Sequence, residues 1–173
     1  MQVLVKEWNF NLKYFEQLQA SMSWLGKKSD TMFIGQAVGV PGTGMYNTLN
    51  GMVDKSKLYE LPVVEEMQMG MSLGLSLSGK VVISIFPRWN FLLCGMNQLV
   101  NHIDKFPAMA PNWKKKNLII RTSVGSERPL FPQYQHIGDY SDMVKNMAPT
   151  IKVIKLNNPD EILKSYKDAY NAP

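Results

Sequence analysis

The chain has 173 residues, of which 45% are hydrophobic and 19% are charged, and its formal net charge is +5. This length suits one domain, residues 1–173, and the apolar fraction excludes an intrinsically disordered chain. No apolar run approaches the roughly 20 residues that cross a bilayer. The basic residues are scattered, without the basic, aromatic-lined face of a nucleic-acid-binding protein. We therefore expect neither a membrane nor a nucleic acid as partner.

Apolar residues recur with helical spacing in some segments and form short continuous runs in others. Phe10, Tyr14 and Leu18 lie four residues apart, which is typical of a helix. Residues 81–86 form a continuous apolar and β-branched run, typical of a strand buried on both faces. Strands and helices alternate, so the sequence predicts an α/β fold with a mainly parallel sheet and helices on both faces. The expected elements are helix 9–25, strand 31–35, helix 46–53, strand 58–64, helix 65–78, strand 81–86, helix 90–105, strand 117–122, a long loop over 123–136, helix 139–147, strand 151–156 and helix 159–170.

The cysteine content and the first residues bear on location. The single cysteine, Cys94, permits no internal disulfide, which is typical of a protein in a reducing compartment. The N-terminal residues lack the charged-then-apolar layout of a signal peptide. A cytoplasmic location is therefore expected.

The most informative segment is the one that places Glu65 at the start of a helix. An apolar run, residues 61–64, precedes this carboxylate, and small residues recur over 70–78. Small side chains at such spacing allow another backbone or a flat ligand to approach closely. A carboxyl group in apolar surroundings can exchange a proton with a ring nitrogen of a ligand. A plainer interpretation is that Glu65 and Glu66 are first-turn acids that the helix dipole stabilises.

A glycine-rich loop, residues 39–44, follows the first expected strand. It invites a dinucleotide-binding interpretation, in which a helix N-terminus holds a pyrophosphate. However, Asn47 stands in place of the third glycine of that motif, Pro41 stiffens the turn, and no acid is assigned to the end of the second strand. A tight turn beside a cofactor or a subunit contact agrees better with the sequence.

The segment Leu61-Pro62-Val63-Val64-Glu65, with its small-residue helix, resembles thiamine-diphosphate enzymes of the transketolase group. It is most similar to the pyrimidine-binding domain in the beta subunits of 2-oxo acid dehydrogenase decarboxylase components. The similarity continues in order over about residues 30–170. The further matching segments are Gly35-Gln36-Ala37-Val38, Asn97 to Asn101, Leu118 to Arg121, Gln135-His136 and Val153 to Asp160.

The resemblance implies a role for each of several residues. Glu65 would exchange a proton with the aminopyrimidine ring of the cofactor, and Phe91 would stack on that ring. Gly39 and Gly42 would lie in a loop close to the cofactor. His136 would act as an acid or base toward the substrate carbonyl. Arg88, Arg121 and Arg128 would hold an anionic group of the substrate through bidentate hydrogen bonds.

The chain also departs from the family pattern. Gln36 replaces a family glutamate, and Leu61 replaces the threonine before the proline. The Gly-Asp-Gly…Asn-Asn segment that binds Mg²⁺ and the diphosphate in this group is absent, as is the C-terminal domain. The resemblance therefore covers half of an active site.

The resemblance implies a split enzyme. A separate diphosphate-binding subunit would supply the Mg²⁺ and diphosphate contacts, in an α2β2 heterotetramer with thiamine diphosphate at the interfaces. The expected reaction makes or breaks a carbon–carbon bond next to a carbonyl, as in 2-oxo acid decarboxylation with acyl transfer or in ketol transfer. The alternative is a non-catalytic interaction or regulatory module of the same fold, which Gln36 and the altered loop over 123–135 favour.

Overall fold

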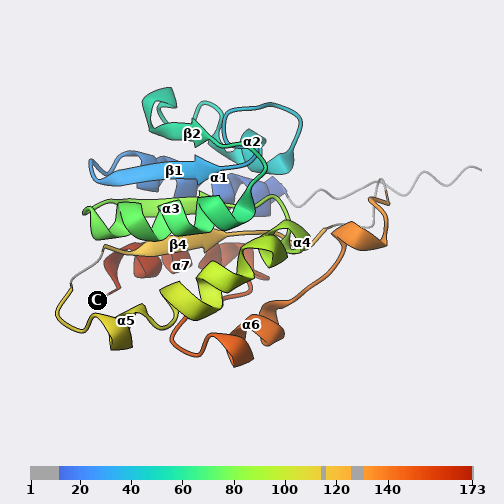
Figure 1. The fold of residues 1–173 in the computed structure, drawn as a ribbon. Helices are drawn as coiled ribbons and strands as arrows, with labels where there is room; N and C mark the ends of the chain where they lie inside the picture. Colours follow the sequence, from blue (N-terminus) through green and yellow to red (C-terminus); the bar gives the residue numbers. More distant parts are fainter. Residues whose placement is uncertain (1–11, 114–115, 126–130, 173) are drawn as a thin grey trace, which may run out of the picture.

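A computed structural model describes residues 12–113, 116–125 and 131–172. Within them, four strands form one sheet in the order β2-β1-β3-β4, and every neighbouring pair is parallel (Figure 1). This confirms the predicted α/β fold with a parallel sheet. The strands are β1 (Thr31–Gly35), β2 (Leu58–Glu60), β3 (Val81–Ile85) and β4 (Leu118–Arg121).

The register makes all four strands end at the same edge of the sheet. Gly35 is aligned with Glu60 on one side and with Ile85 on the other, and Ile85 is aligned with Arg121. Each strand ends at one of these residues. The segments that follow the strands therefore gather along one line, where ligands of open α/β sheets usually bind.

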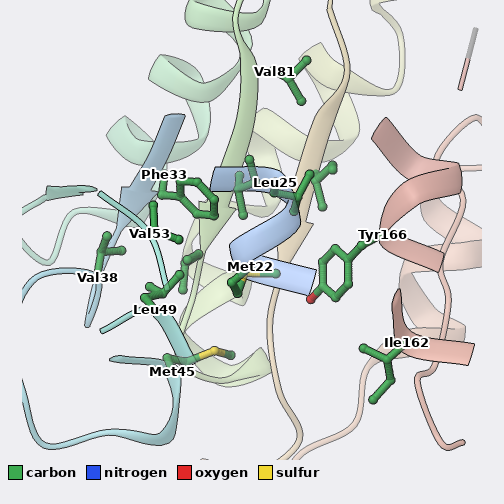
Figure 2. Packing of buried hydrophobic residues seen from close by; sticks show 13 residues of the cluster. Met22, Leu25, Phe33, Val38, Met45, Leu49, Val53, Val81, Ile162 and Tyr166 are labelled. Carbon is green, nitrogen blue, oxygen red and sulfur yellow. The ribbon is translucent and has the colours of Figure 1, made fainter. Parts of the chain in front are cut away.

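Two helices cover one face of the sheet. They are α1 (Leu12–Gly26) and α7 (Pro159–Asn171), which pack against each other behind the sheet in Figure 1. The core on this face includes Met22 and Leu25 of α1, Phe33 and Val81 of the sheet, and Ile162 of α7, each almost fully buried (Figure 2). Full burial of a side chain of this size stabilises a fold by roughly 1.5–3 kcal/mol.

The other face carries α3 (Glu65–Leu77) and α4 (Trp89–Leu92), which lie in front of the sheet in Figure 1. The helical stretch continues from α4 through the 3-10 turn η2 (Leu93–Gly95) and the π-helical η3 (Gln98–Ile103). Met69, Phe86, Trp89 and Leu99 belong to a second core there. The prediction of helices on both faces is thus confirmed, and the helix expected over 90–105 is present with a changing pitch.

The remaining elements are short. Residues 9–11 of the first expected helix lie outside the described residues. The strand expected over 58–64 stops at Glu60, ahead of Pro62, which has no N–H for a ladder. The other short elements are α2 (Gly44–Leu49), η1 (Lys55–Lys57), α5 (Phe106–Met109), η4 (Tyr134–His136) and α6 (Ser141–Met147).

The prediction of a strand over 151–156 is wrong. This segment has no regular secondary structure and forms no ladder with β4. The turn before this segment is fixed to the end of η3. The Thr150 N–H and hydroxyl donate to Asp104 Oδ1 at 2.8 and 2.7 Å. Ile151 and Val153 pack against the second core, and Leu156 packs against the first. The outer edge of β4 is therefore left without a neighbouring strand among the described residues.

One ion pair connects residues 151–156 with the start of α6. Lys155 Nζ lies 3.0 Å from Asp139 Oδ2, and the Ser141 N–H donates to Asp139 Oδ1 at 3.0 Å. The hydrogen bonds from the Ser141 hydroxyl and from Lys155 lower the pKa of Asp139 to about 2. Asp139 thus stabilises the fold above pH 4, and this contribution is lost as the pH falls toward 2.

We expect Asp139→Asn to lower the free energy of unfolding at pH 7 by about 0.5–1 kcal/mol, because the side chain is partly exposed and screened by water. The difference from the wild type should shrink as the pH falls from 4 toward 2 and vanish below the folded-state pKa of about 2. Urea unfolding at pH 7, 4 and 2.5 measures this. The control is Asp168→Asn, whose carboxylate pairs with Lys164 on the exposed side of α7 and should change little. An Asp139→Asn difference that stays constant with pH would contradict the assignment.

None of the helices in the described part of the chain is long and apolar enough to cross a membrane.

Candidate functional site

Glu65 and Gln36 meet at the carboxyl edge of the sheet. Glu65 is the first residue of α3, and Gln36 directly follows β1. Each side chain is 7% exposed, and Gln36 Nε2 donates to Glu65 Oε1 at 3.0 Å. Among the described residues, Gln36 is the only side chain that hydrogen-bonds to this carboxyl group. Glu65 therefore keeps acceptor capacity for one further polar partner.

A buried polar network fixes α3, and with it Glu65, on the sheet. Gln68 Nε2 donates to Ser84 Oγ at 3.1 Å and to the Ile85 carbonyl at 2.9 Å. Ser72 Oγ donates to Ser84 Oγ at 2.9 Å. The small residue Ser72 thus does more than allow close packing, since it hydrogen-bonds to β3. Because buried hydrogen bonds are costly to break, the network holds the first turn of α3 in place.

Phe91 and His136 form the second group of the site. Their ring centroids lie 5.4 Å apart with a 40° tilt, and both residues are half-buried. The Arg88 guanidinium donates to the His136 carbonyl at 3.4 Å. Arg88 therefore helps to hold the turn that carries His136. The Nδ1 atom of His136 is buried and has no hydrogen-bond partner.

The helical stretch that carries Phe91 also packs on the first turn of α3. A Cβ at Gly95 would lie 3.2 Å from the Glu65 carbonyl, so only a glycine permits this approach without a shift. Glu66 accepts hydrogen bonds from Asn97 at 2.6 Å and from Gln98 at 2.9 Å. These bonds lower the pKa of Glu66. Adjacent glutamates thus differ in role: Glu66 links two helices, and Glu65 points to the sheet edge.

Glu60 is a residue that the sequence interpretation missed. It ends β2, and its carboxylate accepts the N–H groups of Ala37, Val38 and Gly39 at 2.9, 2.7 and 2.7 Å. Three successive N–H groups around one point form an anion-binding nest. A carboxylate of the chain already fills this nest, which removes the support for a pyrophosphate-binding loop. The expectation that no acid ends the second strand is wrong, because β2 ends at Glu60. The sequence signal for this role was an acid at the end of a strand that follows a glycine-rich loop.

The two glycines expected near a cofactor lie in different surroundings. The Gly39 N–H is used by Glu60, so this glycine belongs to the turn itself. Gly42 has φ +118° and is exposed, and it lines a groove that extends to the α1 and α7 face. Neither contacts Glu65 in any described hydrogen bond.

The arginines expected to hold a substrate have different surroundings. Arg121 is 6% exposed and shares a face of β4 with Ile119, which belongs to the α1 and α7 core. It therefore lies across the sheet from the α3 face. Arg88 holds the His136 turn, and Arg128 lies outside the described residues. The structure thus unites Glu65 with Gln36, and Phe91 with His136 and Arg88.

The part of the chain that the structure describes has no group of three or more His, Cys, Asp or Glu residues placed to hold a metal ion. Neither the family models nor the curated proteins with which the chain was compared give a match. The geometry and the chemistry of the named side chains therefore carry the functional argument.

Proposed function

We propose that this chain is the pyrimidine-binding subunit of a split thiamine-diphosphate enzyme that makes or breaks a carbon–carbon bond next to a carbonyl. It would act with a separate subunit that binds the diphosphate and Mg²⁺, in an α2β2 assembly located in the cytoplasm. The observation that carries the proposal is the buried Glu65 carboxyl at the carboxyl edge of the sheet, with one amide partner and acceptor capacity to spare.

The residues present fit the aminopyrimidine half of this cofactor. A ring nitrogen requires a carboxyl group that can pass one proton in apolar surroundings. Glu65 supplies the carboxyl group, and the half-buried Phe91 would supply the aromatic surface. The cofactor itself would supply the electron sink for cleavage of the bond.

The chain's own residues divide the remaining work. Glu65 would exchange a proton with the ring, while Gln36 orients the Glu65 carboxyl group through Oε1. His136 has a buried, unpartnered Nδ1 that is available to a polar group of a substrate. Arg88 keeps the turn that carries His136 in position.

An exposed apolar surface beside Glu65 supports the proposed partner. Val63 is 71% exposed, Val64 46% and Met67 40%, although all three are apolar. They surround the entry to α3, and Met71 lies one turn further on the same helix. Clustered exposed apolar side chains next to a site mark an interaction surface. The diphosphate-binding subunit would cover this surface and complete the site.

One observation favours the second candidate, a non-catalytic module of the same fold. The neutral amide of Gln36 already occupies Oε1 of Glu65. If this hydrogen bond serves only the packing of β1 against α3, the chain keeps its assembly surface without turnover.

Native mass spectrometry of the tagged chain, purified from its own cell in buffer with thiamine diphosphate and Mg²⁺, tests the proposal. We expect a complex of two unlike chains, two copies of each, with two cofactor masses. A second chain that carries a Gly-Asp-Gly…Asn-Asn segment would support the split enzyme. A complex without cofactor mass would favour the non-catalytic module, and a chain with neither partner nor cofactor would refute both.

A further inference from the structure

A large groove lies along the open edge of β4. Its volume is about 1160 Å³, which is sufficient for an organic ligand. Residues 151–157 form one wall of the groove, and β4 forms another. The groove lies where the expected fifth strand would have paired with β4. Tyr14 and Leu18 of α1 and Tyr166 of α7 line its other side. Most of these walls are apolar side chains.

Arg121 lines this groove as a buried and incompletely paired cation. Its side chain is 6% exposed, and its Nη1 has no hydrogen-bond partner. No carboxylate of the described residues forms an ion pair with it. Burial of a guanidinium without a counter-charge opposes folding unless a partner compensates it. The groove wall therefore has the character of an anion receptor.

The surroundings of Arg121 confirm where the guanidinium lies. Burial raises the pKa of Tyr14 and of Tyr166, and the nearby Arg121 charge acts against that rise at both phenols. The cation thus lies close to both phenols, between α1 and α7, and Figure 2 shows the Tyr166 ring pointing toward α1. The next residue, Thr122, adds a buried hydroxyl Oγ1 without a partner. Two adjacent residues that line the groove therefore offer unused polar atoms.

The charges along the rim also favour an anion. Lys152 is exposed and lines the groove, and Lys155 lines it while paired with Asp139. Asp139 is thereby neutralised. The buried Arg121 guanidinium suits a monoanion, because a planar carboxylate matches the guanidinium fork and a phosphate dianion needs more donors.

We propose that this groove is a binding site for an amphiphilic monocarboxylate, with the carboxylate on Arg121 and Thr122 and the apolar body along Tyr14, Leu18 and Ile119. The site lies across the sheet from α3 and uses neither Glu65 nor Phe91. Its proposed contacts are therefore separate from those of Glu65 and Phe91, while Arg88 and Gly42 line another part of the same groove.

Isothermal titration calorimetry of the full chain with octanoate tests the proposal. We expect saturable binding, with octan-1-ol and inorganic phosphate at least about tenfold weaker, since each lacks one half of the recognised chemistry. Arg121→Met, which keeps the stem and removes the charge, should weaken octanoate binding about tenfold or more. Lys152→Met, the matched control on the rim, should change it less than threefold.

Two further variants keep the test decisive. Ser165→Phe places a ring in the groove from α7 and leaves Arg121 intact, so it should abolish octanoate binding even if Arg121→Met does not fold. Glu65→Gln should leave octanoate binding unchanged, which separates this site from the proposed cofactor site. Absence of binding to the wild type, or equal weakening by Arg121→Met and Lys152→Met, would overturn the proposal.

Discussion

Replacement of Gly35 by alanine is expected to destabilise the protein by about 4 kcal/mol or more, or to prevent folding. Gly35 ends β1 with φ +136°, a conformation that residues with a side chain rarely adopt. A Cβ there would lie 2.1 Å from the Ile85 carbonyl and 2.6 Å from Gln68 Nε2. The first obstacle is backbone of the neighbouring strand, so it cannot move aside as a flexible side chain would.

The position of Gly35 explains why relaxation is costly. The Gln36 N–H donates to the Ile85 carbonyl at 3.2 Å, and the Leu61 N–H donates to the Gly35 carbonyl at 2.8 Å. A shift of β1 would break both bonds and the Gln68 network that positions α3.

The matched control for this prediction is Gly42→Ala. Gly42 has φ +118°, but a Cβ added there would meet no atom within 4 Å. Alanine at this position adds only backbone strain, of about 1–2 kcal/mol. Urea unfolding followed by circular dichroism measures both variants. Similar losses for the two would show that the φ angle, and not the contact with Ile85, sets the cost.

The sequence predicts best those strands whose own residues require burial. The apolar run over 81–86 requires burial on both faces, and β3 lies in the middle of the sheet. The segment 151–156 has the same local character, yet forms no strand. Pairing with β4 depends on where the preceding turn is anchored, and Asp104 holds Thr150 from 46 residues away. The apolar pattern within residues 151–156 gives no information on a hydrogen bond between residues so far apart in the sequence.

In the candidate site, too, features of a short segment were predictable and contacts between distant segments were not. A carboxylate at the start of a helix is visible in the sequence, and Glu65 is the first residue of α3. Its amide partner, Gln36, is 29 residues distant. The two meet because the Ile85 carbonyl at the end of β3 accepts from both the Gln36 N–H and Gln68 Nε2 of α3. The face of Arg121 was predictable, since on β4 it shares a face with Ile119 and alternates with Ile120, but the open groove beside it depended on the missing fifth strand. Glu60 was overlooked because its role is to close a turn.

The second large effect is expected for Glu65→Gln in the complex with the diphosphate-binding subunit. Glutamine keeps the size of the side chain and can still hydrogen-bond to Gln36, but it cannot pass a proton. Exchange of the thiazolium C2 proton for deuterium, followed by NMR, needs no knowledge of the substrate. We expect this rate to fall about 100-fold or more, in the range of general acid–base catalysis. Cofactor mass in the native complex should persist.

Glu66→Gln is the matched control, because it changes the neighbouring glutamate on the same turn. Its side chain is engaged by Asn97 and Gln98, and glutamine retains an acceptor oxygen for them. The exchange rate should therefore stay within about threefold of the wild type. A fall in Glu66→Gln as large as in Glu65→Gln would indicate a general disturbance of α3. An unchanged rate in Glu65→Gln would remove the proton-transfer role and leave Glu65 as a first-turn acid that packs α3 against β1.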